Sequence, residues 1–290
     1  MERTVLTNAR IFLGNGFSES HNRLLVCNSQ VAEVGFGPSR MNRDDGAVID
    51  CNGGFLTPGF WDIQINGCAG ADFLTSSRET IEQALGRLLL HGVTTIYPTV
   101  ITDSPDRMAA AISKLAAIKD DPARCGIGGL HLEGPAISGG AGKGCHPKEF
   151  IRPLTLAEYY RWQELSGGKI AIVTLAPETE RALSIIPALV TEGTTVALGH
   201  TDADKDTINR AIDCGARLAT HLWNASKKTL DRNLEHIGAL LASDDVFASF
   251  IADSYHIHPD TLKISLRAKG TGRAILVSDA MSGAMMPNGI

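Results

Sequence analysis

Short apolar runs and longer amphipathic stretches alternate along most of the chain. From about residue 55 onward, eight β-like runs are separated by seven segments that have the apolar spacing of helices. The runs lie at 60–65, 94–101, 126–133, 169–177, 194–200, 217–225, 247–256 and 274–281. The helical segments lie at 79–92, 105–118, 155–166, 180–193, 204–215, 234–243 and 259–270. Strands that alternate with helices predict parallel βαβ units, and about eight such units favour a closed (β/α)8 barrel of the TIM type, an α/β fold.

Residues 1–54 have a different texture. The stretches TVLTNARIF, RLLVCN and QVAEVGFG alternate with Gly, Asn and Ser and lack a helical period. We therefore predict a small β-domain over residues 1–54 and a barrel over residues 55–290. An open doubly wound sheet is the structural alternative for the second part, but the sequence has no GxGxxG phosphate-binding pattern after its first α/β strand.

The sequence ends soon after the eighth predicted strand. The few residues that follow Asp279 cannot form an eighth helix. We expect a barrel that lacks its last helix to expose apolar surface on its first and last strands, which favours association.

Composition narrows the class of protein. The chain has 290 residues, of which 43% are hydrophobic and 20% are charged, so it can bury a substantial core. A net charge of −5 argues against a nucleic-acid partner. The N-terminal stretch MERTVLTNARIF lacks a signal-peptide core and no later run reaches a membrane span, so we expect a cytoplasmic protein without a membrane partner. The six cysteines show no CxxC spacing, which favours free thiols.

Four ionisable residues each stand at the end of an apolar run. They are Glu133 in GIGGLHLE, His200 in TTVALGH, His221 in RLATH and Asp279 in AILVSD. Because the carboxyl ends of barrel strands form one face, we expect these side chains to meet. Two imidazoles and a carboxylate suit a zinc-like ion, and a buried carboxylate needs a cation or a hydrogen-bond donor. Taken singly, each histidine could instead be a satisfied core or rim residue, and Asp279 could cap a turn.

Seven segments follow one another in a fixed order: PGFWDIQINGCAGADF, HLEGPAISGGAGKGCHPKEF, VTLAPE, LGHTDAD, THLWNAS, ADSYHIHPD and ILVSDAM. Together they resemble the N-acetylglucosamine-6-phosphate deacetylases of the amidohydrolase superfamily. The resemblance spans about residues 55 to 283. It implies a (β/α)8 barrel with a small β-sandwich built from both chain ends, so that residues 1–54 would be half of that sandwich.

The resemblance also implies roles for individual residues. Glu133, His200 and His221 would bind a divalent metal ion, and Asp279 would be the catalytic acid and base. The remaining candidates would lie at the substrate: Gln64, Asn66, Cys145, His146, Asn224, Ala225, Arg232 and His256. Arg232 falls where the family binds phosphate across a dimer interface, and a guanidinium fork suits phosphate. The alternative is a solvated charge within KKTLDR.

The residues at two other strand ends bear on the number of metal ions. Many amidohydrolases hold a second metal with HxH after the first strand, where this chain has Gln64 and Asn66. The fourth run ends in TLAP and offers no lysine for a bridging carbamate, because Lys169 is at its opposite end. We therefore expect one divalent ion, with Zn²⁺ first and Fe²⁺, Co²⁺ or Mn²⁺ as alternatives, and Gln64 and Asn66 orienting water or substrate. His131 shares the strand parity of Glu133 and is expected one layer deeper, as a supporting or core residue.

These implications predict hydrolysis of N-acetyl-D-glucosamine 6-phosphate to D-glucosamine 6-phosphate and acetate in amino-sugar catabolism. The metal would activate water, Asp279 would move the proton, and His146 or His256 would help to stabilise the oxyanion. We expect a homodimer for a complete form. Two alternatives stay open: an amidohydrolase for another amide or a cyclic substrate, and an inactive fragment or binding module. The configuration at C4 of the sugar is also open.

Overall fold

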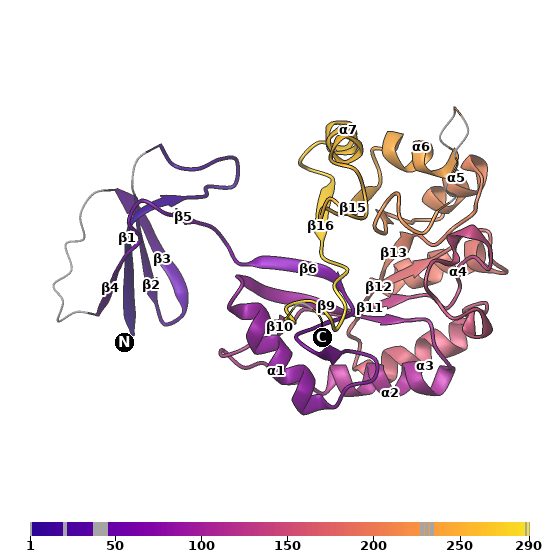
Figure 1. The fold of residues 1–290 in the computed structure, drawn as a ribbon, viewed down its shortest axis with the longest axis horizontal. Coiled ribbons are helices and arrows are strands. Elements are labelled where there is room, and N and C mark those ends of the chain that lie inside the picture. The colour runs from indigo at the N-terminus through magenta and orange to yellow at the C-terminus, as the bar shows by residue number, and fades with distance from the viewer. Residues whose placement is uncertain are drawn as a thin grey trace. The chain divides into compact units, whose positions relative to one another are not determined.

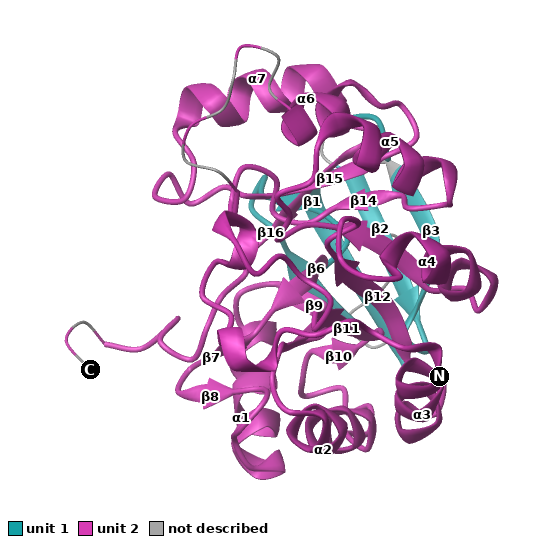
Figure 2. Cartoon of the chain, turned by 90° about the vertical axis from the view of Figure 1, so that its right-hand side faces the viewer, with its two compact units in different colours: residues 1–59 teal, residues 60–290 magenta. Residues whose placement is uncertain are grey.

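The structure, a computed structural model, describes residues 2–19, 22–36, 46–226, 229, 232, 235–287 and 289. The chain divides into two compact units, with the boundary between Gly59 and Phe60. Figure 2 shows the two units in different colours.

The first unit is a small β-sheet, so the β-rich N-terminal part predicted from the sequence is confirmed. Its strands have the order β3-β2-β1-β4, and β5 also pairs with β1. The antiparallel strands are β1 (Arg3–Ile11), β2 (Asn22–Cys27) and β3 (Gln30–Phe36). The strands parallel to β1 are β4 (Ala47–Asp50) and β5 (Phe55–Leu56). Since β5 pairs with β1, residues 55 and 56 belong to this sheet.

The second unit is an eight-stranded parallel barrel, which confirms the predicted fold class. β6 pairs with β9, and the sheet continues in the order β9-β11-β12-β13-β14-β15-β16. These strands are β6 (Phe60–Ile65), β9 (Val93–Ile101), β11 (Leu130–Glu133), β12 (Ile170–Leu175), β13 (Thr195–Leu198), β14 (Leu218–Ala219), β15 (Phe247–Ile251) and β16 (Ala274–Val277). β10 (Gly126–Ile127) adds a short pairing to β9, and β7 (Gly67–Cys68) pairs with β8 (Ala71–Asp72).

Hydrogen bonds join the first and last barrel strands. The Asp279 N–H donates to the Gln64 carbonyl oxygen at 2.9 Å, and the Asn66 N–H donates to the Ala280 carbonyl oxygen at 2.7 Å. The buried carboxylate of Asp62 accepts from the hydroxyl and the backbone N–H of Ser278. These bonds bring the end of β16 beside the end of β6, so the barrel is nearly closed.

Among the described residues, the α-helices lie on the outside of the barrel (Figure 1). They are α1 (Arg78–Leu89), α2 (Pro105–Ala116), α3 (Leu156–Ser166), α4 (Ala182–Thr191), α5 (Lys205–Asp213), α6 (Glu235–Ala242) and α7 (Pro259–Lys269). Several begin where a short polar side chain accepts a backbone N–H of the first turn, as Ser77, Ser104, Thr155 and Asp204 do. Within the part of the chain that the structure describes, no helix follows β16, and none of the helices is long and apolar enough to cross a membrane.

Successive side chains of a barrel strand point alternately toward the helices and toward the barrel interior. On β11, Leu130 and Leu132 pack into the main core between the strands and the helices, whereas His131 and Glu133 face the barrel interior. His131 bonds to the Ile63 carbonyl oxygen at 3.0 Å and to the Thr174 hydroxyl at 2.7 Å. The predicted inward direction of His131 is therefore confirmed.

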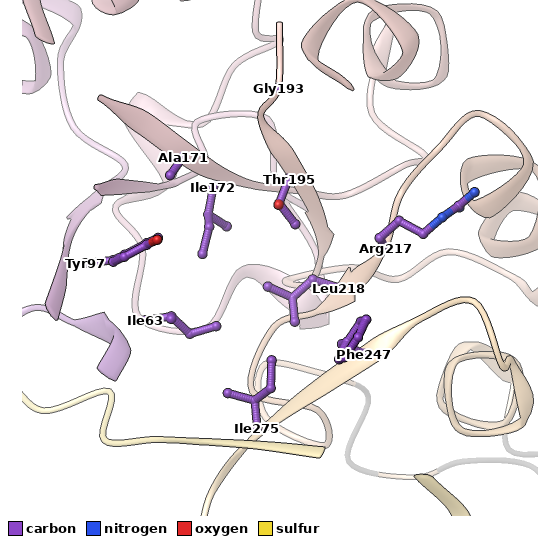
Figure 3. Close-up of a pocket in the computed structure, with 10 residues that line it drawn as sticks. All are labelled: Ile63, Tyr97, Ala171, Ile172, Gly193, Thr195, Arg217, Leu218, Phe247 and Ile275. Carbon is purple, nitrogen blue, oxygen red and sulfur yellow. The ribbon is translucent and has the colours of Figure 1, made fainter. Parts of the chain in front are cut away.

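The two ends of the barrel differ in chemistry. A pocket of about 470 Å³ lies at the N-terminal half, with mostly apolar walls (Figure 3). Its floor includes Ile63, Ile172, Leu218 and Ile275. Glu133, His200 and His221 lie at the opposite, carboxyl ends of the strands. The ionisable groups therefore identify the carboxyl end as the candidate site.

Candidate active site

Three buried side chains converge at the carboxyl ends of β11, β13 and β14. Glu133 is the last residue of β11, and His200 and His221 follow β13 and β14 by two residues each. The Glu133 Oε1 atom lies 3.1 Å from His200 Nε2 and 3.0 Å from His221 Nε2. The two Nε2 atoms are 3.0 Å apart. Three potential ligand atoms thus form a nearly equilateral triangle.

The three atoms lie close enough together to bind one small divalent cation. In tetrahedral zinc sites the bonds to nitrogen and oxygen are about 2.0–2.2 Å, which separates neighbouring ligand atoms by roughly 3.3–3.6 Å. The three atoms here are 3.0–3.1 Å apart, so they would move apart slightly around an ion. The His200 Nδ1 atom lies 3.0 Å from the Gly142 carbonyl oxygen. Because a carbonyl oxygen only accepts, Nδ1 carries the proton and Nε2 offers its lone pair to the triangle. Among the residues that the structure describes, Glu133, His200 and His221 are the one group identified that could hold a metal ion.

The charges of the three groups support each other. Burial alone would raise the pKa of Glu133, but the two imidazoles outweigh it and hold this pKa well below its usual range. Burial alone would lower the pKa of His221, but the bond to the Glu133 carboxylate raises it. A carboxylate therefore persists here despite its burial, as metal ligation requires.

Asp279 stands beside this cluster at the carboxyl end of β16. Its Oδ1 atom accepts a hydrogen bond of 2.7 Å from the Asn66 side-chain amide. Burial, and next the negative charge of Glu133, raise the pKa of Asp279 to about 6. A carboxyl group with a pKa near neutrality can both accept and return a proton.

Three of these residues have a left-handed backbone. The φ angle is 50° at His200, 29° at His221 and 47° at Asp279. Residues other than glycine adopt this region only in a few per cent of cases, with Asn, Asp and His the most frequent, so these three positions carry local strain. Each of these residues turns the chain out of a barrel strand just where its side chain enters the site.

Gln64 and Asn66 hold the two carboxylates. The Gln64 side-chain amide donates to Glu133 Oε1 at 2.8 Å, as the Asn66 amide does to Asp279. Within the described residues, the oxygens of both side-chain amides are buried and have no hydrogen-bond partner. They are therefore free to accept from water or substrate, and a direct role in orienting either one stays a prediction.

His146 lies against His200, and Cys145 lies at the surface beside it. The rings of His146 and His200 have centroids 4.3 Å apart, and His146 Nε2 is 3.8 Å from Glu133 Oε2. His146 Nδ1 accepts from the Thr102 N–H at 3.4 Å, which leaves the ring proton on Nε2. Burial lowers the pKa of His146 to about 4, so the ring is neutral at pH 7. Cys145 is exposed, and its thiol pKa is raised by partial desolvation and then by the charge of Glu133.

The other predicted substrate residues follow β14 and β15. The Asn224 N–H and side-chain amide both donate to the His221 carbonyl oxygen, and Ala225 adjoins Gly144 of the glycine-rich loop. Arg232 is exposed, and both of its neighbours in sequence lie outside the described residues. His256 is half exposed and pairs with Asp253 at 2.7 Å. The structure therefore brings Asn224 to His221 and Ala225 to Gly144, and it leaves Arg232 and His256 on the surface.

Sequence reasoning missed two residues that support the cluster. Thr102 donates from its hydroxyl to the Glu133 carbonyl oxygen at 3.1 Å and from its N–H to His146. Asp62 joins β6 to β16 next to Asp279. The carboxylate within the apolar run FWDIQI was a usable signal for Asp62, whereas a threonine after a strand carries none.

Comparison with known proteins finds relatives of this chain by sequence. No family model matches it. It is 36% identical over 239 residues to the N-acetylglucosamine-6-phosphate deacetylase of Bacillus subtilis, covering 81% of this chain and 60% of that protein. It is 38% identical over 230 residues to the N-acetylgalactosamine-6-phosphate deacetylase of a Shewanella species, covering 79% of this chain and 57% of that protein. The chain thus spans about three fifths of the length of these relatives.

A solved structure matches the fold over a larger share of both chains. The crystal structure of N-acetyl-D-glucosamine-6-phosphate deacetylase from Mycobacterium smegmatis superposes with a TM-score of 0.87 at 30% sequence identity. The match covers 99% of this chain and 73% of that one. Sequence and fold thus agree, and the chain belongs to the N-acetylglucosamine-6-phosphate deacetylase family.

Proposed function

We propose that this chain carries the catalytic barrel of a metal-dependent hydrolase that converts N-acetyl-D-glucosamine 6-phosphate and water to D-glucosamine 6-phosphate and acetate. The observation that carries the proposal is the triangle of Glu133, His200 and His221 with Asp279 beside it. The relatives named for this activity support it.

The triangle would hold one divalent cation, with Zn²⁺ as the first choice and Fe²⁺, Co²⁺ or Mn²⁺ as alternatives. When bound, such an ion supplies a Lewis acid that activates water and polarises the acetyl carbonyl. The Gln64 side-chain amide donates to the Oε1 atom of Glu133, and this hydrogen bond would orient the carboxylate for metal binding. We place one ion here because Gln64 and Asn66 occupy the positions where imidazoles would be needed for a second.

Asp279 would carry the proton. Its Oδ1 atom is held by Asn66, which leaves Oδ2 to accept the proton of the attacking water. The C–N bond of the acetamido group then breaks, and Asp279 returns the proton to the leaving amine. The products are a free amine and acetate.

His146 would act on the carbonyl side of the reaction. Its Nδ1 atom is engaged by Thr102, and its neutral ring keeps a proton on Nε2, which is a suitable donor to a developing oxyanion. His256 is the alternative donor, but its half-exposed ring is paired with Asp253. Cys145, Asn224 and Ala225 would lie along the bound sugar.

Arg232 would bind the phosphate, because a guanidinium pairs with a phosphate dianion through two parallel hydrogen bonds. Its exposure is compatible with a site completed by a second copy in a homodimer. A cytoplasmic location, predicted from the sequence, stays a prediction.

The substrate can be tested directly. Purified protein with added Zn²⁺ is supplied with N-acetylglucosamine 6-phosphate, its galactosamine epimer or unphosphorylated N-acetylglucosamine, and acetate release is measured. We expect the first substrate to react fastest. Faster release from the epimer, which the Shewanella relative motivates, would change the assigned sugar. No acetate from any of the three in a folded, metal-loaded protein would refute the proposal.

A further inference from the structure

The glycine-rich loop after β11 lies directly on the end of β13. The Ser138 N–H donates to the His200 carbonyl oxygen at 2.8 Å. In the opposite direction, His200 Nδ1 donates to the Gly142 carbonyl oxygen at 3.0 Å. The loop thus binds the ligand His200 through both its backbone and its imidazole.

Asp202, two residues after His200, fixes this loop. Its carboxylate accepts the Gly142 N–H, at 3.1 Å from each oxygen, and it also accepts the Ser138 hydroxyl. Glu178 holds the segment from the other side, since it accepts the Asp202 N–H at 2.7 Å and the Thr201 hydroxyl at 2.6 Å. Asp202 therefore holds the N–H of Gly142, and the carbonyl of Gly142, which belongs to the next peptide group, receives His200.

The glycines of the loop make this approach possible. A Cβ atom at Gly142 would lie 2.6 Å from the Thr201 nitrogen, and one at Gly140 would lie 2.5 Å from Asp202 Oδ2. At Gly142 the close atoms are backbone, so a side chain there would require a shift of the loop or of residues 200 and 201, whereas at Gly140 the Asp202 carboxylate would have to move. The run SGGAGKG therefore serves close backbone contact with residues 200–202.

We propose that Asp202 is a positioning residue for the metal ligand His200. Its carboxylate fixes the backbone of Gly142 through the N–H, and the Gly142 carbonyl in the next peptide group selects the Nδ1–H tautomer of His200 and directs Nε2 at Glu133 and His221. The inference rests on the proposed metal-dependent function. It adds a residue that acts on the site through the loop rather than by contact with the metal.

A purely structural role for Asp202 makes a different prediction. If the carboxylate only fastened a surface loop, its removal would lower the melting temperature and leave metal affinity and the His200 tautomer unchanged. Asp204 offers a matched control, because it is two residues away and caps α5 by accepting the Thr207 N–H at 2.8 Å.

The experiment measures Zn²⁺ affinity by competition with a chromogenic chelator in wild type, Asp202→Ala, Asp202→Asn and Asp204→Ala. We expect Asp202→Ala to weaken Zn²⁺ binding by about 10- to 100-fold, the usual range for groups that orient metal ligands. Asp202→Asn should bind within about 3-fold of wild type, because its amide can accept from Gly142 and donate to Ser138. Asp204→Ala should bind like wild type.

A second readout is the ¹⁵N spectrum of the His200 ring in metal-free protein. Wild type should show the Nδ1–H tautomer, and Asp202→Ala should show a mixture. If Asp202→Ala does not fold, Gly142→Ala displaces the same carbonyl and should weaken Zn²⁺ binding in the same way. Zn²⁺ affinity and tautomer equal to wild type in a folded Asp202→Ala or Gly142→Ala variant would overturn the inference alone. A wild type that binds no Zn²⁺ would overturn the metal site and this inference together.

Discussion

Replacing Asp279 with Asn should separate an effect on catalysis from an effect on folding. The φ angle of Asp279 is 47°, a left-handed conformation that Asn tolerates well. Alanine there would add strain on the order of 1 kcal/mol. The side-chain carbonyl of the new Asn can still accept the Asn66 amide that now bonds to Asp279 at 2.7 Å. The substitution therefore removes a charge and a proton acceptor and keeps the shape.

The structure sets the sign and size of the stability effect. Burial and the charge of Glu133 raise the pKa of Asp279 from 3.8 to about 6 in the folded protein. Above that pH the folded chain holds a charge that the unfolded chain holds more easily, which destabilises the metal-free protein by up to about 3 kcal/mol. Below pH 3.8 the effect vanishes. Metal-free Asp279→Asn should thus be as stable as wild type at pH 7, or more stable.

Catalysis should change in the opposite direction. An amide cannot take the proton of water, so we expect kcat to fall by about 10²- to 10⁴-fold. Bound Zn²⁺ should stay at one equivalent, because Asp279 is outside the ligand triangle. Urea unfolding of the metal-free protein, metal content and acetate release are measured on the same preparations. Near-normal turnover would refute the acid and base assignment, and loss of the metal would make Asp279 a ligand.

Three further outcomes are expected. Elemental analysis should find one divalent ion per chain and much less in His200→Ala; two ions, or undiminished metal in the variant, would contradict a single site held by His200. Arg232→Ala should raise KM for the phosphorylated sugar and leave the unphosphorylated sugar unchanged, whereas an equal loss with both would make Arg232 structural. Burial lowers the pKa of His131 from 6.5 to about 4. Between these pH values only the unfolded chain binds the proton, so the metal-free protein should lose up to about 3 kcal/mol of stability as the pH falls from 6.5 to 4. His131→Gln should reduce this pH dependence of the unfolding free energy, measured by urea unfolding at several pH values. The same pH dependence in wild type and His131→Gln would contradict the assignment to His131.

The barrel could be predicted because its signals are local and repeated. Apolar runs with β-like composition mark the strands, and capping residues such as Ser104 and Asp204 mark where helices begin. The convergence of Glu133, His200 and His221 followed from topology, since parallel strands deliver their carboxyl ends to one face.

Contacts between distant backbone groups could not be predicted in the same way. The Gly142 carbonyl meets His200 across 58 positions of sequence, and no periodicity encodes that contact. The amides of Gln64 and Asn66 bond to carboxylates on other strands, which depends on barrel register rather than on residue type. The phosphate-binding role of Arg232 stays a prediction, because the residues on both sides of Arg232 lie outside the described part of the chain.

The left-handed backbone at His200 and His221 sets the function of the site against the thermal stability of the fold. Each such conformation costs on the order of 1 kcal/mol or more for a residue with a side chain, and glycine would relieve it. A library of variants screened only for survival at high temperature would therefore accumulate Gly at positions 200 and 221 and discard both imidazoles. Heat resistance in this protein should be selected together with metal retention, since the residues that strain the fold are the ones proposed to hold the ion.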